Sequence, residues 1–152
     1  LELVSYNDDK VIIWADYVHN IKSIKQALEK IYGGGSVVTY YGGTALDDRK
    51  QAIELFQSND NNVRFFVGNQ MTAGYGITLT NANQVIYYSN SFDLEKRLQS
   101  EDRAHRIGQI NKVTYYDLTA KDTIDEKIVK TLCSKLDLAQ QVLGDGYQSW
   151  LN

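Results

Sequence analysis

The sequence predicts an α/β domain in which a mostly parallel sheet is covered by helices on both faces. Short apolar runs rich in β-branched and aromatic residues alternate with stretches whose apolar residues recur at helical spacing. This alternation favours parallel pairing, because parallel neighbours need a crossover element between them. The chain has 152 residues, 43% of them hydrophobic. That is enough for one core, so we expect a single domain over residues 1–152.

The first half of the chain predicts three strands and two helices. Lys10–Ala15 is a short apolar run, typical of a strand buried on both faces. Apolar residues then recur at helical spacing from Ile21 to Ile31, and the glycines at 33–35 end that helix. The next elements are a strand, a helix whose Ile53 and Phe56 face inward, and a strand, at Ser36–Tyr40, Ala45–Phe56 and Val63–Val67.

The second half continues the same alternation. The polar, glycine-bearing stretch between residues 68 and 83 is too long for a tight turn. The elements that follow it are a strand, a helix, a strand and a helix, at Gln84–Tyr88, Leu94–His105, Lys112–Leu118 and Ile124–Leu143. The single Cys133 cannot form an internal disulfide. We interpret it as a small core residue of the last helix.

The topology also predicts where ligands bind. Open parallel sheets hold their ligands at the loops beyond the carboxyl ends of the strands. In this chain those loops start near Asp16, Tyr41, Gly68 and Ser89. We therefore expect these four loops to meet at one edge of the sheet and to contribute to a binding site.

Charge and hydropathy exclude several classes of protein. The net charge of −3 at pH 7 excludes a globally basic nucleic-acid-binding domain, so any DNA site must be local. No apolar run approaches the roughly 20 residues of a membrane-spanning helix. The N-terminal residues also lack a basic segment followed by an apolar stretch. We expect a soluble, cytoplasmic protein.

The most informative segment is Gln99–Gln109, with the sequence QSEDRAHRIGQ. Arg103 and Arg106 are three residues apart, so on a helix they project from one face, and Gln99, four residues before Arg103, joins them. Two guanidiniums and an amide suit the oxygens of a polyphosphate, and an arginine supplied across a cleft stabilises the charge that develops in phosphoryl transfer. For an arbitrary pair of arginines, a solvated helix face is the better interpretation. The full string reverses that preference.

This segment resembles a motif of the Swi/Snf-related members of helicase superfamily two, in their second, C-terminal RecA-like domain. In that motif a Gln, two Arg and a closing His-Arg-Ile-Gly-Gln recur. The resemblance implies that Arg106 is an arginine finger for the γ-phosphate of ATP held by another domain, with Arg103 on the phosphates and Gln99 as support. Gly108 lets the chain turn off the helix. The likeness extends over about residues 10–143 and implies a three-layer RecA-like, P-loop NTPase-like fold.

The stretch Gly68–Thr80 resembles the fifth motif of the same family, which contacts DNA phosphates and the edge of the nucleotide. A glycine-bearing loop leaving a strand lets backbone N–H groups approach an anion. By position, the resemblance assigns DNA contacts to Asn69, Gln70 and Thr72 and ATP contacts to Gly74, Gly76 and Thr78. The family usually has Ser-Thr at positions 69–70, Gly-Gly at 73–74 and Asn at 78. The residues present here keep most of the hydrogen-bonding capacity, and the resemblance leaves the individual contacts open.

The turn after the second strand resembles a further family segment, in which glycines precede a helix with an early arginine. Here it is Tyr40-Tyr41-Gly42-Gly43-Thr44 followed by Arg49. Thr44 is placed to cap the helix, and the backbone donors of Gly42 and Gly43, with Arg49, suit a DNA phosphate. An ordinary capped turn with a solvent-facing arginine is an equally good interpretation.

Motifs that the sequence lacks indicate that this chain is one part of a two-domain ATPase. It contains no Gly-x-x-x-x-Gly-Lys-Ser/Thr loop and no Asp-Glu pair after an apolar strand. The resemblance therefore implies that an upstream domain holds ATP and Mg²⁺ and that this domain supplies the arginines. It also implies that the two domains move along duplex DNA, as members of the family do. We expect the isolated domain to be inactive.

Two other interpretations remain open. One is a binding module for nucleic acid or protein that keeps the fold without ATP hydrolysis. The other is a flavodoxin-like or receiver-like domain, which Asp16, without an acidic companion, does not favour.

Because no long insertion separates residues 68–80 from 99–109, we expect a compact phage or bacterial member, in the cytoplasm of a bacterium or of an infected host.

Overall fold

The protein contains a five-stranded, fully parallel sheet. The computed structural model describes residues 9–72 and 76–143. The strands follow the order β2-β3-β1-β4-β5, and each neighbouring pair is parallel. Their bounds are β1 (Lys10–Trp14), β2 (Val37–Tyr40), β3 (Phe65–Gly68), β4 (Ala82–Tyr87) and β5 (Thr114–Asp117). The predicted parallel sheet is confirmed, with each strand within a few residues of its expected place.

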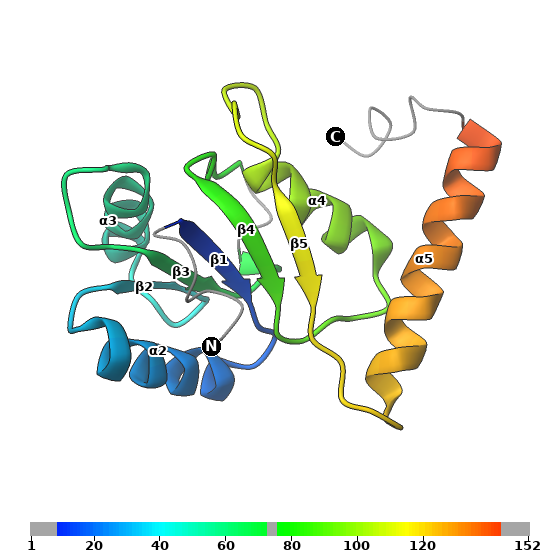
Figure 1. Ribbon diagram of the computed structural model, residues 1–152, viewed down its shortest axis with the longest axis horizontal. Coiled ribbons are helices and arrows are strands. Elements are labelled where there is room, and N and C mark those ends of the chain that lie inside the picture. Colours follow the sequence, from blue (N-terminus) through cyan, green and yellow to red (C-terminus); the bar gives the residue numbers. More distant parts are fainter. Residues whose placement is uncertain (1–8, 73–75, 144–152) are drawn as a thin grey trace.

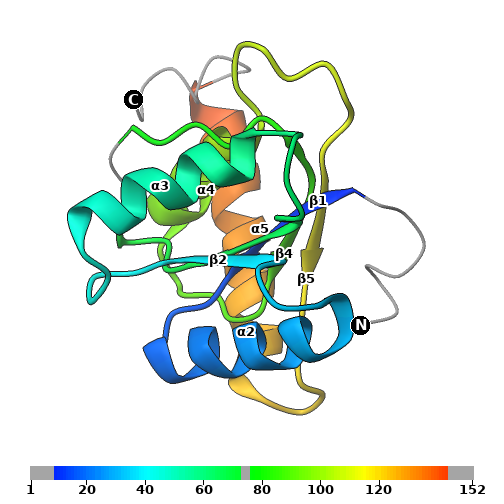
Figure 2. The ribbon, with the colours of Figure 1, turned by 90° about the vertical axis from the view of Figure 1, so that its left-hand side faces the viewer.

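Helices cover both faces of this sheet, as predicted. Figure 2 shows α2 on one side of the sheet and α3 and α4 on the other, while α5 runs along the outer side beyond β5 (Figure 1). The bounds are α2 (Val18–Tyr32), α3 (Leu46–Gln57), α4 (Leu94–Ala104) and α5 (Ile124–Leu143). Among the described residues, no helix is long and apolar enough to cross a membrane.

The central strand β1 explains why its sequence is apolar without alternation. Val11 and Ile13 lie in the core beneath α2, whereas Ile12 and Trp14 lie in the core beneath α3 and α4. Because successive side chains of a strand point to opposite faces, a strand covered on both sides needs apolar residues at every position. All four side chains are buried.

The prediction that Cys133 is a core residue is wrong. Cys133 is exposed, and Ile31 is exposed although it continues the apolar row of α2. Helix α5 lies outside the sheet and buries a narrow stripe that includes Ile128 and Leu132. Cys133 follows Leu132 by one residue, which is about 100° around a helix, and so it points away from that stripe.

The segment between β3 and β4 runs from the carboxyl ends of the strands (the carboxyl edge of the sheet) back to their amino ends (the amino edge). These strands lie on either side of β1 and run parallel to it. The chain must therefore cross β1 and return from the carboxyl edge to the amino edge. Ile77 and Leu79 are buried in the core on the side of α3 and α4, so the described end of this crossing segment, from residue 76 on, packs over that face. This path places residues 69–72 and 78–81 at opposite ends of one connection.

Candidate functional site

The loops after β1, β2, β3 and β4 meet at the carboxyl edge, as predicted. The side-chain amide of Asn69 donates to the carbonyl of Asp16 at 2.7 Å. The backbone N–H of Asp16 in turn donates to Ser89 Oγ at 2.8 Å. The backbone N–H of Asn69 donates to the carbonyl of Tyr40 at 2.9 Å. These bonds join the ends of the four strands into one surface.

Asn69 shapes the loop after β3. Besides its bond to Asp16, its Oδ1 accepts from the backbone N–H groups of Met71 at 2.9 Å and Thr72 at 3.3 Å. Its side chain is thus occupied internally, and its part in any site is to hold the turn. The neighbouring Gln70 is only 6% exposed. Within the described part of the chain, Gln70 Nε2 has no hydrogen-bond partner.

The glycine turn after β2 lies beside this loop. A side-chain carbon built at Gly42 would lie 3.9 Å from Thr72 Oγ1, so the two predicted DNA-contact segments are neighbours. The capping role predicted for Thr44 is wrong, because Ala45 is the N-cap of α3 and no side chain caps it. Instead, the carbonyl of Thr44 accepts from Arg49 Nε at 2.8 Å. The Arg49 guanidinium also stacks on the Tyr40 ring, 5.9 Å from its centroid.

The second group of predicted residues lies near the amino end of β4. The backbone N–H of Leu79 donates to the carbonyl of Arg103 at 2.8 Å. Arg106 Nη1 donates to Thr78 Oγ1 at 3.4 Å. The end of the crossing segment and the end of α4 are therefore in contact. The expectation that ligand-facing residues gather at the carboxyl edge thus does not hold for the arginines, because α4 runs back across the sheet before they occur (Figure 1).

The prediction that both arginines project from one helix face is wrong. Helix α4 ends at Ala104, and His105 is its C-cap, so Arg106 belongs to the turn that follows. Gly108 has a φ of 104°, and the N–H of Gln109 donates to the carbonyl of Arg106 at 2.9 Å. A left-handed backbone angle favours glycine, which confirms that the chain turns off the helix there.

Arg103 and Arg106 nevertheless line the same concavity. Arg103 is only 7% exposed. Burial lowers its pKa, Asp102 opposes that shift, and the nearby positive charge of Arg106 adds to it. Arginine remains a cation in proteins, so two positive charges lie close together. An open concavity of about 660 Å³ is lined by Asp102, Arg103, His105, Arg106, Ile107, Gly108 and Gln109.

The remaining predicted ATP-contact residues have different surroundings. Gln99 Nε2 donates to Glu95 Oε1 at 3.0 Å, along the helix. Gly76 has a φ of 70°, which a residue with a side chain rarely adopts. Gly74 lies outside the described residues. Of this set, the described contacts join only Thr78 directly to an arginine of the concavity.

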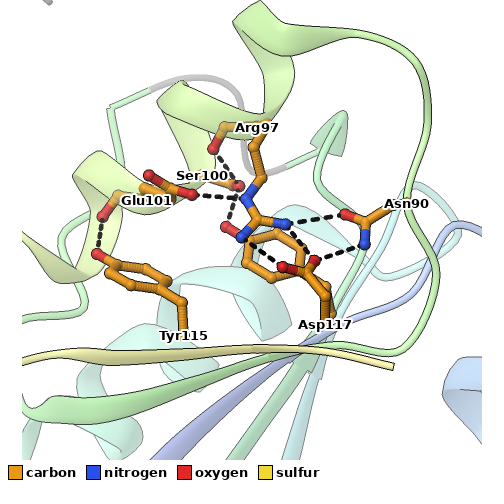
Figure 3. A network of polar contacts seen from close by, with 7 residues as sticks. Asn90, Arg97, Ser100, Glu101, Tyr115 and Asp117 are labelled. Carbon is orange, nitrogen blue, oxygen red and sulfur yellow. Dashed lines mark hydrogen bonds and ion pairs between the residues drawn. The ribbon is translucent and has the colours of Figure 1, made fainter. Parts of the chain in front are cut away.

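Sequence reasoning missed the network that attaches α4 to the sheet, drawn in Figure 3. Arg97 is its centre. Its Nε donates to Glu101 Oε1 at 2.5 Å, and its two terminal nitrogens donate to the carboxylate of Asp117 on β5. Arg97 Nη1 also donates to Asn90 Oδ1 at 3.1 Å, and the guanidinium lies 3.5 Å from the centroid of the Tyr87 ring.

The electrostatics of this network keep Arg97 charged. Burial alone lowers its pKa, but the hydrogen bonds that it donates to the carboxylates of Asp117 and Glu101 help to outweigh that effect, so the pKa lies above its ordinary value. Spacing in the sequence reveals only the pair of Arg97 and Glu101, four residues apart on a helix. The contact with Asp117 depends on β5 lying beside β4, which spacing along the chain does not predict.

A second overlooked residue is Gln109, which fixes the turn after α4. Its Nε2 donates to the carbonyls of Thr80 at 2.9 Å, Ala82 at 2.7 Å and Ala104 at 3.2 Å. Its Oε1 accepts from the N–H of Asn111 at 2.9 Å. One side chain thus ties together the crossing segment, β4 and α4, and it holds the concavity in shape.

Comparisons with known proteins agree on one family. The family model described as "Helicase conserved C-terminal domain" matches residues 1–108. The chain is 32% identical over 139 residues to the ATP-dependent helicase fft3 of Schizosaccharomyces pombe, covering 91% of this chain and 15% of that protein. It is 37% identical over 102 residues to the ISWI chromatin-remodeling complex ATPase ISW1 of Saccharomyces cerevisiae, covering 67% and 9%. It is 29% identical over 137 residues to the chromatin-remodeling ATPase INO80 of Homo sapiens, covering 90% and 9%.

A solved structure has the same fold. The crystal structure of the C-terminal part of the Fun30 ATPase domain superposes with a TM-score of 0.74 and 29% sequence identity, covering 94% of this chain and 46% of that one. The likeness confirms the predicted RecA-like fold. The chain spans 9% to 15% of the length of the three relatives named above.

Proposed function

The chain belongs to the helicase conserved C-terminal domain family, and from that premise we propose that it is the second motor lobe of an ATP-dependent DNA translocase. The relatives named above are described as ATP-dependent helicases and chromatin-remodeling ATPases. In this proposal ATP binds in a cleft between two lobes. This lobe supplies positive charge to the phosphates and contacts the DNA backbone.

The observation that carries the proposal is the pair of arginines at one concavity. Arg103 is held in the last turn of α4, and Arg106 projects from the turn beyond it. Guanidiniums present planar donors that match phosphate oxygens. Phosphoryl transfer depends on positioned positive charge around the transferred group, because little other chemistry is left to the protein. Arg106 is the exposed one of the two, and we assign it to the γ-phosphate.

The proposal assigns ATP and Mg²⁺ mainly to the first lobe. The sequence carries no Gly-x-x-x-x-Gly-Lys-Ser/Thr loop, which is the segment that cradles phosphates and contributes a metal ligand. The cationic concavity fits the outer phosphates of a nucleotide held by another surface. Gly74, Gly76, Thr78 and Gln99 have subsidiary roles here, at the nucleotide edge of the cleft.

The proposal assigns the DNA backbone to the carboxyl edge. The exposed glycine turn at 42–43 lies beside Thr72, and backbone N–H groups of such turns suit phosphate oxygens. Arg49 adds a cation next to this turn, since its guanidinium is bonded to the carbonyl of Thr44. Gln70 adds a buried side-chain nitrogen, Nε2, without a hydrogen-bond partner among the described residues, which suits it to support the loop or a bound phosphate.

Communication between the two ends is part of the proposal. The crossing segment begins with Asn69 at the carboxyl edge and reaches Thr78 and Leu79, which contact the arginine end. In this proposal a shift of the nucleotide at one end displaces the DNA-facing loop at the other, because both ends belong to the single connection between β3 and β4. Closure on ATP and opening after hydrolysis would then move this lobe along DNA.

The source and location of the protein remain predictions. The relatives named here come from fungi and from a mammal, so they do not support the compact phage or bacterial type. The short spacing between residues 68–80 and 99–109 is the feature of the sequence that led us to expect that type. A cytoplasmic location rests on the same expectation.

The test is ATP turnover by the complete protein without DNA, with single strands and with duplex DNA. We expect duplex DNA to stimulate turnover and the isolated 152-residue chain to be inactive. Arg106→Ala should lower turnover by about 10³ while ATP affinity changes much less. Lys121→Ala, which removes an exposed cation outside both groups, is the control. Unchanged turnover in Arg106→Ala would refute the arginine-finger assignment, and a complete protein that never hydrolyses ATP would indicate a binding module.

A further inference from the structure

The residue after Arg106 is an isoleucine that lies entirely in solvent. Ile107 is fully exposed, and Ile110, in the same turn, is 92% exposed. Single apolar residues at a surface are common and need no explanation by themselves. The position of Ile107 is unusual for a different reason, since it lies on the rim of a cationic concavity.

The turn that carries Ile107 is fixed by internal hydrogen bonds. The N–H of Gln109 donates to the carbonyl of Arg106, and the side chain of Gln109 bonds to three carbonyls from the crossing segment, β4 and α4. Gly108 supplies the left-handed backbone angle that the turn requires. An apolar side chain on a fixed turn loses little conformational freedom when a partner covers it.

Ile107 and the two arginines share one concavity. Arg103, Arg106 and Ile107 all contribute to its lining, whereas Ile110 does not. Any surface that brings phosphate groups to the two guanidiniums must therefore come close to Ile107. Burial of its side chain removes apolar area from water, which lowers the free energy. This stabilisation is available only when the partner surface covers Ile107.

We propose that Ile107 is an apolar docking contact for the ATP-binding lobe, covered by that lobe when the cleft closes on ATP. The inference rests on the proposed function, because it takes the lobe that carries ATP as the partner. It adds that the partner presents an apolar patch beside the position of the γ-phosphate. The contact couples closure to the correct placement of Arg106, since both residues belong to one turn.

Alkylation of an introduced thiol measures this burial directly. Ile107→Cys and Ile110→Cys are made separately in the complete protein, with Cys133, which is exposed, and any other reactive cysteine replaced by serine. Alkylation is timed with and without a non-hydrolysable ATP analogue and duplex DNA. We expect the analogue to slow alkylation at position 107 at least about tenfold, and at position 110 less than about twofold. An unchanged rate at position 107, or equal protection at both positions, overturns the proposal.

Kinetics separate this inference from the proposed function. Ile107→Ser should lower kcat/KM for ATP about tenfold, since it removes the apolar contact and leaves both arginines in place. Ile110→Ser should stay within about twofold of the parent. If Arg106→Ala abolishes turnover while Ile107→Ser is unchanged, only the docking contact is refuted. If Arg106→Ala leaves turnover unchanged, the proposed function itself fails.

Discussion

Substitution of Arg97 by methionine tests the network that holds α4 on the sheet. The Arg97 side chain is 13% exposed, and the carboxylates of Glu101 and Asp117 keep exposures of 28% and 26%. Methionine retains much of the apolar stem and removes the charge and all five donors. Removing one partner of a fully buried ion pair costs about 3–5 kcal/mol. Because water reaches both carboxylates here, we expect the free energy of unfolding to fall by about 2–3 kcal/mol.

Urea unfolding of the 152-residue chain measures this loss. The control is Lys25→Met, which breaks the surface pair between Lys25 and Glu29, 3.6 Å apart, and should cost less than about 0.5 kcal/mol. Adding Asp117→Leu to Arg97→Met removes a carboxylate that has lost its cation and keeps only the hydrogen bond from Asn90 Nδ2, at 2.6 Å. The double variant should therefore lose less stability than the sum of the two single variants. If Arg97→Met costs no more than the control, the network does not anchor α4, and the reasoning is refuted.

Two further predictions concern the carboxyl edge. Gly68→Ala should lower the free energy of unfolding by about 1–3 kcal/mol, because its new carbon would lie 3.0 Å from the carbonyl of Tyr40 and 3.1 Å from ring atoms of Phe66 and Trp14. Thermal unfolding checks it against Gly34→Ala, where nothing lies within 4 Å, and equal melting temperatures would contradict it. Burial raises the pKa of Asp16, against smaller opposing effects of Lys96 and Ser89, so the folded state holds that proton more tightly than the unfolded chain. The contribution of Asp16 to stability is then fully present below its ordinary pKa, about 4, and is lost as the pH rises through its raised pKa. Asp16→Asn should accordingly stabilise the chain at pH 7 by less than about 1 kcal/mol, with no gain at about pH 4. Urea unfolding at both pH values measures the two gains, and a larger gain at about pH 4 than at about pH 7 would contradict the assignment.

The fold followed from local patterns to within a few residues. The apolar run at Lys10–Ala15 predicted β1 because a strand covered on both faces leaves no position for a polar side chain. Helix ends were harder to place. Helix α4 was expected to include His105 but ends at Ala104, because the bonds of Gln109 to distant carbonyls favour a turn there. Arg106 consequently leaves the helix face that its spacing from Arg103 indicated.

The candidate site could be predicted as a set of residues and only partly as an arrangement. The string of residues 99–109 indicated which side chains we propose to meet phosphate, since the chemical types and their order are local properties of the chain. The sequence did not indicate that the side chain of Thr44 fails to cap α3, or that the side-chain amide of Asn69 donates to the carbonyl of Asp16. Those outcomes depend on which strand ends lie side by side, and the sheet order β2-β3-β1-β4-β5 sets that.

The sequence by itself determined the class of fold, the approximate elements and which arginines we propose to bind phosphate. Periodicity and side-chain chemistry are local, so they can be recognised without knowing the neighbours of each residue. Only the tertiary structure decided that Asp117 holds Arg97, that Gln109 fixes the turn of Arg106, and that Cys133 faces solvent. The two contacts join groups that are far apart along the chain, and the exposure of Cys133 depends on which face of α5 packs against the rest of the protein. Packing, rather than spacing along the chain, decides all three.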